Sequence, residues 1–290
     1  MTLKPRILVI DGNLAATRAA QVAAGGQPSG EGYAQVLQEL APLTCDIVRP
    51  ADAPVQWAAG ASLADYDGAV ITGSALNVYA GGTPVERQVE LALAVGEQGV
   101  PMFGSCWGMQ LTVTAAGGRV RRNPLGREFG FARRIQVSEL GRAHALFAGK
   151  PSVFEAITVH SDDIEQLPRG ARVLASNEAG VQAIELNLAR STVWAVQYHP
   201  EYSFGEIAAT ALRYADALLA EGLFATRSEL EQYVAELRRM AQDPAALALA
   251  WRHGLGSAVL DVRLRRAELH NWLQHQVLPG LARRQRARAR

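Results

Sequence analysis

The stretch VPMFGSCWGMQ, Val100–Gln110, places one cysteine between two glycines at the end of an apolar run. Its apolar part, residues 100–105, is typical of a buried strand, and residues 109–118 have the apolar spacing of a helix. In a Gly-x-Cys-x-Gly turn between a strand and a helix, the glycines leave room for a strained backbone and for a substrate. We interpret Cys106 as a nucleophile on such a turn; the alternative is a buried structural cysteine beside packing glycines.

Outward from this turn, short apolar runs alternate with helical stretches. Runs typical of buried strands occupy residues 6–11, 45–50, 66–73 and 100–105, and helical spacing marks residues 32–41, 84–99 and 109–118. Continuous apolar strands separated by helices indicate a parallel sheet that is covered on both faces. The predicted fold is therefore a three-layer α/β/α arrangement with a mainly parallel central sheet. Cys106 is expected at the carboxyl end of a middle strand, where such sheets bind ligands.

The middle of the chain indicates an extension of the same sheet. Five strand-like runs follow one another closely, at residues 134–140, 152–160, 171–177, 181–187 and 191–199. Their short spacing predicts mixed or antiparallel strands added to the parallel ones. A helix is predicted after them, over residues 203–222.

From about Thr226 the chain is helical in pattern and rich in Leu, Ala and Arg. We therefore predict one domain over residues 1–225 and a helical extension over residues 226–290. Its amphipathic helices either cover an exposed side of the sheet, or cap the site and dock a partner or a second copy, as in a homodimer; amphipathicity fits both. The last eight residues carry five arginines, which indicates a solvated end or a segment that binds a polyanion.

Composition excludes several classes of protein. The 290 residues have a net charge of +1, so no overall nucleic-acid footprint is expected. The two cysteines do not form a disulfide framework, and the scattered histidines give no metal-ligand spacing. We see no signal peptide and no apolar run long enough for a membrane span. These features predict a soluble, cytoplasmic protein whose Cys106 stays a thiol, without a metal.

A nucleophilic cysteine needs a base, and the base needs an acceptor that orients it. The best candidate among the six histidines is His199, which ends a strand-like run and is followed by Pro200 and Glu201. Proline stops the strand, and a carboxylate two residues on can reach the ring nitrogen that faces away from the sulfur. We interpret His199 as the base and Glu201 as its orienting group. The alternative is an ordinary strand-end histidine beside a solvated glutamate.

Three motifs taken together, ITGS (residues 71–74), GSCWGMQ (residues 104–110) and VQYHPE (residues 196–201), resemble the class I, or triad, glutamine amidotransferase family. The resemblance covers residues 6–223. It is strongest to the glutaminase domain of GMP synthetase and its stand-alone relatives, and it implies a flavodoxin-like fold.

This resemblance implies roles for several residues. Cys106 would attack the side-chain amide of glutamine, and His199, assisted by Glu201, would move protons. The backbone N–H groups of Gly73 and Trp107 would hold the oxyanion. The resemblance also assigns substrate contacts, to Gln110, Glu128 and Phe129.

The implied reaction is hydrolysis of glutamine through a Cys106 γ-glutamyl thioester, without a cofactor, giving glutamate and ammonia. Since no SGGxDS-type or Walker A loop follows residue 225, we expect a separate synthetase to receive the ammonia. The alternative is a γ-glutamyl hydrolase or peptidase that uses the same triad. Ser74 favours this alternative, because stricter family members have a Gly-Pro pair after the oxyanion glycine. A non-enzymatic binding protein is disfavoured by the intact triad, and the chaperone and intracellular-protease branch by its lack of this HPE motif.

Overall fold

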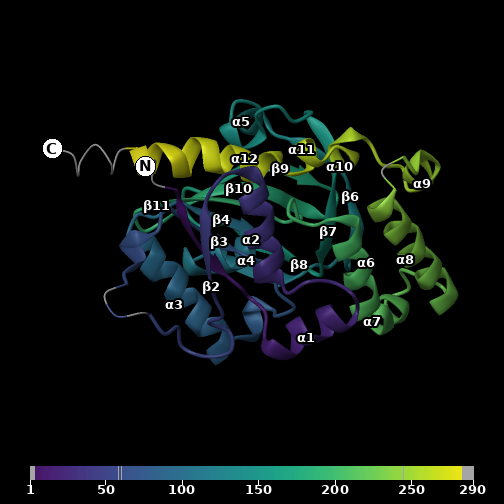
Figure 1. The fold of residues 1–290 in the computed structure, drawn as a ribbon, viewed down its shortest axis with the longest axis horizontal. Helices are drawn as coiled ribbons and strands as arrows, with labels where there is room; N and C mark the ends of the chain where they lie inside the picture. The colour runs from purple at the N-terminus through teal and green to yellow at the C-terminus, as the bar shows by residue number, and fades with distance from the viewer. Residues whose placement is uncertain (1–3, 58, 60, 244, 283–290) are drawn as a thin grey trace.

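A nine-stranded mixed sheet forms the centre of the molecule (Figure 1). The structure is a computed structural model that describes residues 4–57, 59, 61–243 and 245–282; the arginine-rich tail, residues 283–290, lies outside the described residues. Across the sheet the strands are β2 (Thr44–Val48), β1 (Arg6–Ile10), β3 (Gly68–Ile71), β4 (Met102–Ser105), β11 (Ser191–Val196), β10 (Gly180–Leu188), β9 (Arg172–Asn177), β6 (Glu128–Val137) and β7 (Val153–His160).

The first five strands of this order run parallel, and the other four continue the sheet in antiparallel pairs. A second, two-stranded sheet pairs β5 (Arg119–Arg122) with β8 (Asp162–Gln166). The predicted α/β/α fold with an antiparallel extension is therefore confirmed. Strand β6 begins at Glu128, earlier than the pattern predicted, because it pairs with β7 from Glu128 opposite His160 onward.

Helices cover both faces of the sheet. They are α1 (Ala15–Ala23), α2 (Ser29–Leu40), α3 (Thr83–Glu97), α4 (Trp107–Ala115), α5 (Glu139–Arg142), α6 (Phe204–Arg213), α7 (Ala215–Ala220), α8 (Arg227–Gln242), α9 (Leu247–Arg252), α10 (Ser257–Leu260), α11 (Val262–Arg265) and α12 (Ala267–Trp272). Helix α1 was not predicted. The helix predicted over residues 203–222 is two helices that meet at Tyr214.

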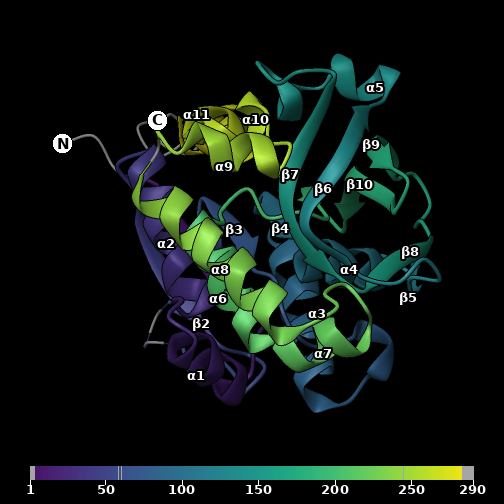
Figure 2. The same ribbon diagram turned by 90° about the vertical axis from the view of Figure 1, so that its right-hand side faces the viewer.

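Alternation along the strands divides the core into two faces. In β1, Ile7 and Val9 pack in one cluster with α2, whereas Leu8 and Ile10 pack in another with α3 and α4. This is the period-two pattern of a sheet that is buried on both sides. A third cluster joins β6 and β7 to α6 and α8, and Figure 2 shows α8 lying beside α6.

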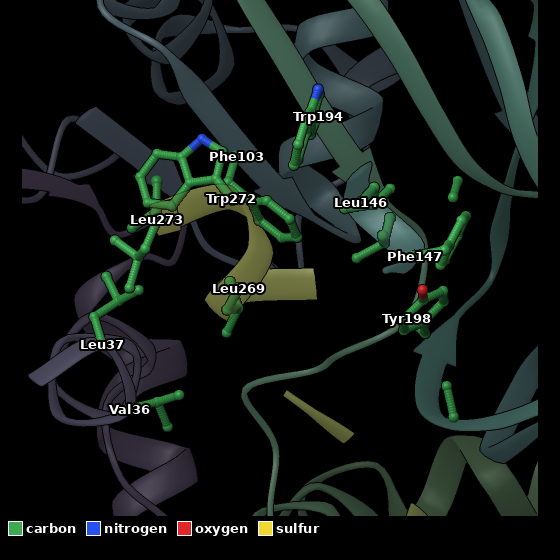
Figure 3. Packing of buried hydrophobic residues seen from close by; sticks show 14 of the residues in the cluster. Val36, Leu37, Phe103, Leu146, Phe147, Trp194, Tyr198, Leu269, Trp272 and Leu273 are labelled. Carbon is green, nitrogen blue, oxygen red and sulfur yellow. The ribbon is translucent and has the colours of Figure 1, made fainter. Parts of the chain in front are cut away.

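The C-terminal helices complete the α2 face of the sheet. Trp272 of α12 is fully buried, and its ring meets the edge of Phe103 at a centroid distance of 6.1 Å (Figure 3). The fit is tight, because a Cβ on Gly68 of β3 would lie 2.7 Å from the indole. The extension therefore covers an otherwise exposed side of the sheet. The division at residue 225 stays a prediction, since these helices share their cores with the sheet.

A buried ion pair also ties α12 to the sheet. Glu268 accepts from Lys150 Nζ and from the Tyr198 hydroxyl, each at 2.5 Å, and the Lys150 and Glu268 side chains are almost without solvent exposure. Burial lowers the pKa of Lys150, against the attraction of Glu268. The C-terminal extension therefore reaches Tyr198, the residue before His199.

No helix in the described ranges is long and apolar enough to cross a bilayer.

Replacing the buried indole tests how much the extension contributes to stability. We expect Trp272→Ala to lower the free energy of unfolding by about 3–5 kcal/mol, because it removes a large core side chain and leaves a cavity. Trp251→Ala is the matched control: this tryptophan of α9 is 76% exposed, so its loss is expected to change stability by less than about 0.5 kcal/mol. Denaturant titration measures both. Equal losses for the two variants would contradict the structural role of Trp272.

Candidate active site

Cys106 lies on a strained turn between β4 and α4. Its backbone has φ 52° and ψ −101°, a conformation that costs a non-glycine residue about 1–3 kcal/mol. The turn is held by the Cys106 N–H, which donates to the Val196 carbonyl of β11 at 2.8 Å. It also needs Gly108, because a Cβ there would lie 2.5 Å from the Ile71 carbonyl oxygen of β3. Neighbouring strands therefore hold the buried cysteine in the strained strand-to-helix turn predicted from the glycines.

His199 reaches the same edge of the sheet from the neighbouring strand. Strand β11 pairs with β4 so that Val196 lies opposite Ser105, and both strands end there. Three residues later, His199 Nδ1 hydrogen-bonds to Glu201 Oε1 at 2.7 Å, and the imidazole stacks on Tyr202 with ring centroids 4.1 Å apart. The His199 and Glu201 side chains are buried, and no described residue hydrogen-bonds to His199 Nε2.

Glu201 is held by two residues that the sequence analysis did not identify. Ser105 Oγ donates to Glu201 Oε2 at 3.0 Å, and the Tyr33 hydroxyl of α2 shares a hydrogen bond with the same Ser105 Oγ at 3.0 Å. Ser105 precedes the cysteine in the quoted motif, so its position was a usable signal; Tyr33 had none. This chain of contacts fixes the carboxylate that orients His199.

The surroundings of His199 favour its protonated form. Burial opposes a charged imidazole, but the Glu201 carboxylate and the nearby Cys106 sulfur outweigh it and raise the pKa of His199 to about 10. Because the pKa is raised in the folded state, protonated His199 stabilises the fold fully below about pH 6.5. That stabilisation is lost as pH rises through about 10.

Gly73 lines the same hollow as Cys106, and Trp107 follows the cysteine in the chain; their oxyanion role stays a prediction. Gly73 follows β3, and its carbonyl accepts from Asn13 Nδ2 at 3.0 Å, while its own N–H has no acceptor among the described residues. Trp107 is in the first turn of α4, where N–H groups lack partners within the helix. A Cβ on Gly73 would lie 2.6 Å from His199 Cε1, so the glycine and the imidazole are in close contact.

Two small hollows meet at Cys106. We name the first the His199 hollow; its polar lining includes Asn13, Arg18, Gln21, His199, Tyr202 and Arg213. We name the second the Gln110 hollow; its polar lining includes Asn77, Gln110, Arg127, His160, Ser161 and Asp162. Each measures about 30 Å³, and both are bordered by Ser74, Cys106, Val159 and Tyr214. A substrate whose reacting carbon lies at the sulfur can therefore extend to either side.

The predicted substrate residues differ in where they lie. Gln110 is buried, lines its hollow and donates from Nε2 to Gln197 at 3.4 Å. Glu128 is not among the lining residues of either hollow; its carboxylate pairs with His160 at 2.8 Å and Asn177 at 2.6 Å. Phe129 packs on Tyr233, also away from the lining. The substrate roles of Glu128 and Phe129 stay predictions.

Arg127, next to Glu128 in sequence, lies in the Gln110 hollow but was not identified from the sequence. It donates two hydrogen bonds, at 2.7 and 3.0 Å, to Glu221, the residue that follows α7. Within the described residues, no group of three His, Cys, Asp or Glu side chains has a metal-binding arrangement.

The amino-acid sequence is similar to those of a known family and of characterised proteins. Residues 33–214 match the family described as Glutamine amidotransferase class-I. The chain is 34% identical over 286 residues to a γ-glutamyl-L-1-hydroxyisopropylamide hydrolase from a Pseudomonas species, covering 97% of this chain and 96% of that protein. It is 32% identical over 244 residues to a glutamine-hydrolysing GMP synthase from Thermomicrobium roseum. That match covers 82% of this chain but 43% of the synthase, so the chain spans less than half of that relative.

Solved structures show the same fold at low identity. A glutamine amidotransferase from Thermotoga maritima has a TM-score of 0.66 at 15% identity, covering 95% of this chain and 99% of that one. A glutamine amidotransferase from Methylobacillus flagellatus has a TM-score of 0.57 at 21% identity, covering 97% and 95%. Coverage this wide includes helices after residue 225.

Removing the Glu201 charge tests the electrostatics of the pair. We expect Glu201→Gln to lower the pKa of His199 well below 10, because the amide keeps the ring buried but no longer offsets its positive charge. Histidine NMR titration measures this pKa, with the His199 signal assigned by its loss in His199→Asn.

Glu165→Gln is the matched control for this titration. Glu165 lies in β8, where its carboxylate pairs with Arg119, and its loss is expected to leave the His199 titration in place. An unmoved pKa in Glu201→Gln would contradict the assigned pair.

Proposed function

This chain belongs to the class I glutamine amidotransferase family, whose relatives include hydrolases of γ-glutamyl amides, and we propose that Cys106, His199 and Glu201 carry out its amidohydrolase reaction. The observation that carries the proposal is the meeting of three groups at one sheet edge. They are the strained cysteine, a histidine held at 2.7 Å by a buried carboxylate, and Gly73, which is in close contact with that imidazole.

The first half of the reaction forms a thioester. The Cys106 sulfur adds as its thiolate to the amide carbon, beside protonated His199, and the N–H groups of Gly73 and Trp107 hold the oxyanion; a donor of this kind contributes about 2.7–4 kcal/mol. Protonated His199 then gives its proton to the amide nitrogen as the C–N bond breaks, so that a neutral amine or ammonia leaves. The γ-glutamyl group remains on the sulfur.

The second half restores the enzyme. Neutral His199 takes a proton from water, whose oxygen attacks the thioester carbon, and the C–S bond breaks to release glutamate. The hydrogen bond that His199 Nδ1 donates to Glu201 Oε1 keeps Nε2 free for the reacting atoms in both halves. No step requires an oxidant, a reductant or a metal.

The Gln110 hollow is our candidate site for the amino-acid end of the substrate. It presents the Arg127 guanidinium and the Asp162 carboxylate, and Asp162 is oriented by Asn77 at 2.8 Å and Tyr79 at 2.9 Å. The Asp162 carboxylate suits an α-ammonium, and the Arg127 guanidinium, which pairs with Glu221 through Nε and Nη2, keeps Nη1 for an α-carboxylate. The γ-carbon would then lie at Cys106, and the leaving nitrogen on the His199 side.

A γ-glutamyl amide of a small amine is the substrate class we favour. The hydrolase from Pseudomonas aligns with this chain over nearly the whole length of both, including the helices that complete the sheet face. A reducing, cytoplasmic setting agrees with the free Cys106 thiol.

Glutamine hydrolysis for a separate synthetase is the second candidate. It is supported by the match to the glutamine-hydrolysing GMP synthase. Purified chain distinguishes the two: turnover of γ-glutamyl amides without any partner supports the first candidate, and glutamine turnover that requires an added synthetase supports the second.

Removing the nucleophile is the direct test. We expect Cys106→Ala to abolish glutamate release from glutamine and from γ-glutamyl amides, because no thioester forms. Cys45→Ala is the matched control, since this cysteine lies in β2 outside both hollows and should keep wild-type turnover. A coupled glutamate assay measures both, and hydroxylamine should trap the thioester as γ-glutamyl hydroxamate with Cys106 present. Turnover by Cys106→Ala would rule the mechanism out.

Filling the space beside Gly73 tests the contact between the glycine and the imidazole. Gly73→Ala is expected to lower kcat by about 10²-fold, because a methyl group there displaces His199 from its place beside the sulfur. Gly280→Ala is the control, since a Cβ at that position meets no atom within 4 Å. Steady-state kinetics on the same substrate checks both. A wild-type kcat in Gly73→Ala would contradict the proposed role of the contact between Gly73 and His199.

A further inference from the structure

The two hollows beside Cys106 differ in charge, and this difference points to the leaving group. We propose that the amine released from the substrate carries a carboxylate, which Arg213 binds in the His199 hollow. The proposal rests on the function proposed above and names its substrate class: γ-glutamyl amides of amino acids or of other small aminocarboxylates.

The leaving amine must lie in the His199 hollow. The group that protonates the leaving nitrogen is His199, and its side chain lines this hollow but not the Gln110 hollow. A substrate that extends from the sulfur in both directions therefore places its amine side next to Tyr202 and Arg213. The chemistry of that lining decides which amines fit.

Every charged side chain that lines the His199 hollow, apart from His199 itself, is an arginine. Arg18 is already neutralised, because its guanidinium meets Asp52 at 2.5 Å and Asp11 at 4.0 Å. Arg213 is different: no described carboxylate lies within 4.0 Å of its nitrogens. One cation in this hollow is therefore left without a protein counter-charge.

The guanidinium of Arg213 is held in place by contacts with two neighbouring side chains. Its Nε donates to Gln21 Oε1 at 2.8 Å, and its guanidinium lies over the Tyr214 ring, 4.2 Å from the centroid. Gln21 is buried and is itself held by Thr210 and Glu206, each at 3.2 Å. These contacts join α1 to α6 and leave the outer guanidinium nitrogens available. A preorganised guanidinium fork matches a carboxylate through two hydrogen bonds.

Glu206, which shares Gln21 as a partner with Arg213, does not neutralise this cation. Glu206 Oε1 accepts from the Gln27 N–H at 3.0 Å, and Oε2 accepts from Gln21, so both oxygens are directed to α1 and the loop after it. A partly buried cation without a partner is unfavourable, and an anionic substrate group relieves that cost. The Gln110 hollow shows the opposite arrangement, with Arg127 and Asp162 both present.

A matched pair of substrates tests the proposal. γ-Glutamyl-L-alanine and γ-glutamyl-L-1-hydroxyisopropylamide share the same carbon skeleton and differ only in a carboxylate against a hydroxymethyl group on the leaving amine. We expect wild-type enzyme to have a kcat/KM about 10-fold or more higher for the alanine amide, because a charge-assisted pair is stronger than a neutral hydrogen bond. The ratio of the two kcat/KM values is the readout.

Substitution of Arg213 assigns the preference to this side chain. In Arg213→Met the ratio should fall by about 10- to 100-fold, mainly through a higher KM for the alanine amide. Arg169→Met, at an exposed position outside both hollows, should keep the wild-type ratio. Arg213→Lys keeps the positive charge but loses the two parallel donors of the guanidinium, so it should give an intermediate ratio. The lysine variant also tests the proposal if the methionine variant does not fold.

The outcomes separate this proposal from the one it rests on. Cys106-dependent cleavage with a wild-type ratio at or below one, or with a ratio that Arg213→Met leaves unchanged, overturns the carboxylate assignment and keeps the amidohydrolase function. No cleavage of either amide or of glutamine by folded wild-type protein overturns both.

Discussion

The left-handed backbone conformation at Cys106 is the constraint on which the rest of the site depends. Such a conformation persists in a non-glycine residue only where its surroundings enforce it. Here β11, a neighbour of β4, holds it through the hydrogen bond from Cys106 N–H to the Val196 carbonyl, and α4 packs so closely on β3, the other neighbour, that only glycine fits at position 108. The same two strands lead into Gly73 and His199. The strands that hold the strain therefore also bring Gly73 and His199, the proposed oxyanion donor and base, to the edge where the sulfur lies.

The second level of organisation is the support behind the triad. Glu201 is held by Ser105 and Tyr33, and Tyr198 is held by Glu268 of the C-terminal helix α12. The segment that contains His199 is thus fixed from the sheet, from α2 and from the extension. A helical segment that the family's catalytic motifs do not include has become part of the core. The match to the γ-glutamyl-L-1-hydroxyisopropylamide hydrolase covers 97% of this chain and so includes helices of the extension.

In the mechanism proposed above, substrate choice depends on the two sides of the sulfur rather than on the triad. The proposed triad chemistry is the same for ammonia and for a larger amine, because both would leave with a proton from His199. The Gln110 hollow offers both signs of charge, whereas the His199 hollow offers an arginine without a protein partner. A shared catalytic mechanism can therefore serve different γ-glutamyl amides through a few lining residues.

The sequence by itself determined the fold class, the antiparallel extension, and the turn that carries Cys106. These follow from local patterns: apolar strands between helices, and glycines around one cysteine. His199 and Glu201 were also predictable, because Pro200 ends the strand after His199 and the Glu201 carboxylate follows only two residues later. The roles of Glu128 and Phe129 rested on resemblance alone, and the structure places both outside the lining of the hollows.

Only the tertiary structure decided which distant side chains meet. Tyr33, Arg213 and Trp272 lie on separate helices and carry no local signal of their roles, because their partners are distant in the chain. From the sequence alone, Arg213 is indistinguishable from the other basic residues of amphipathic helices. Its availability depends on Gln21 from α1 and on where the neighbouring carboxylates point. Periodicity predicts which face of a helix is buried, but the packing of helices against the sheet determines what that face contacts.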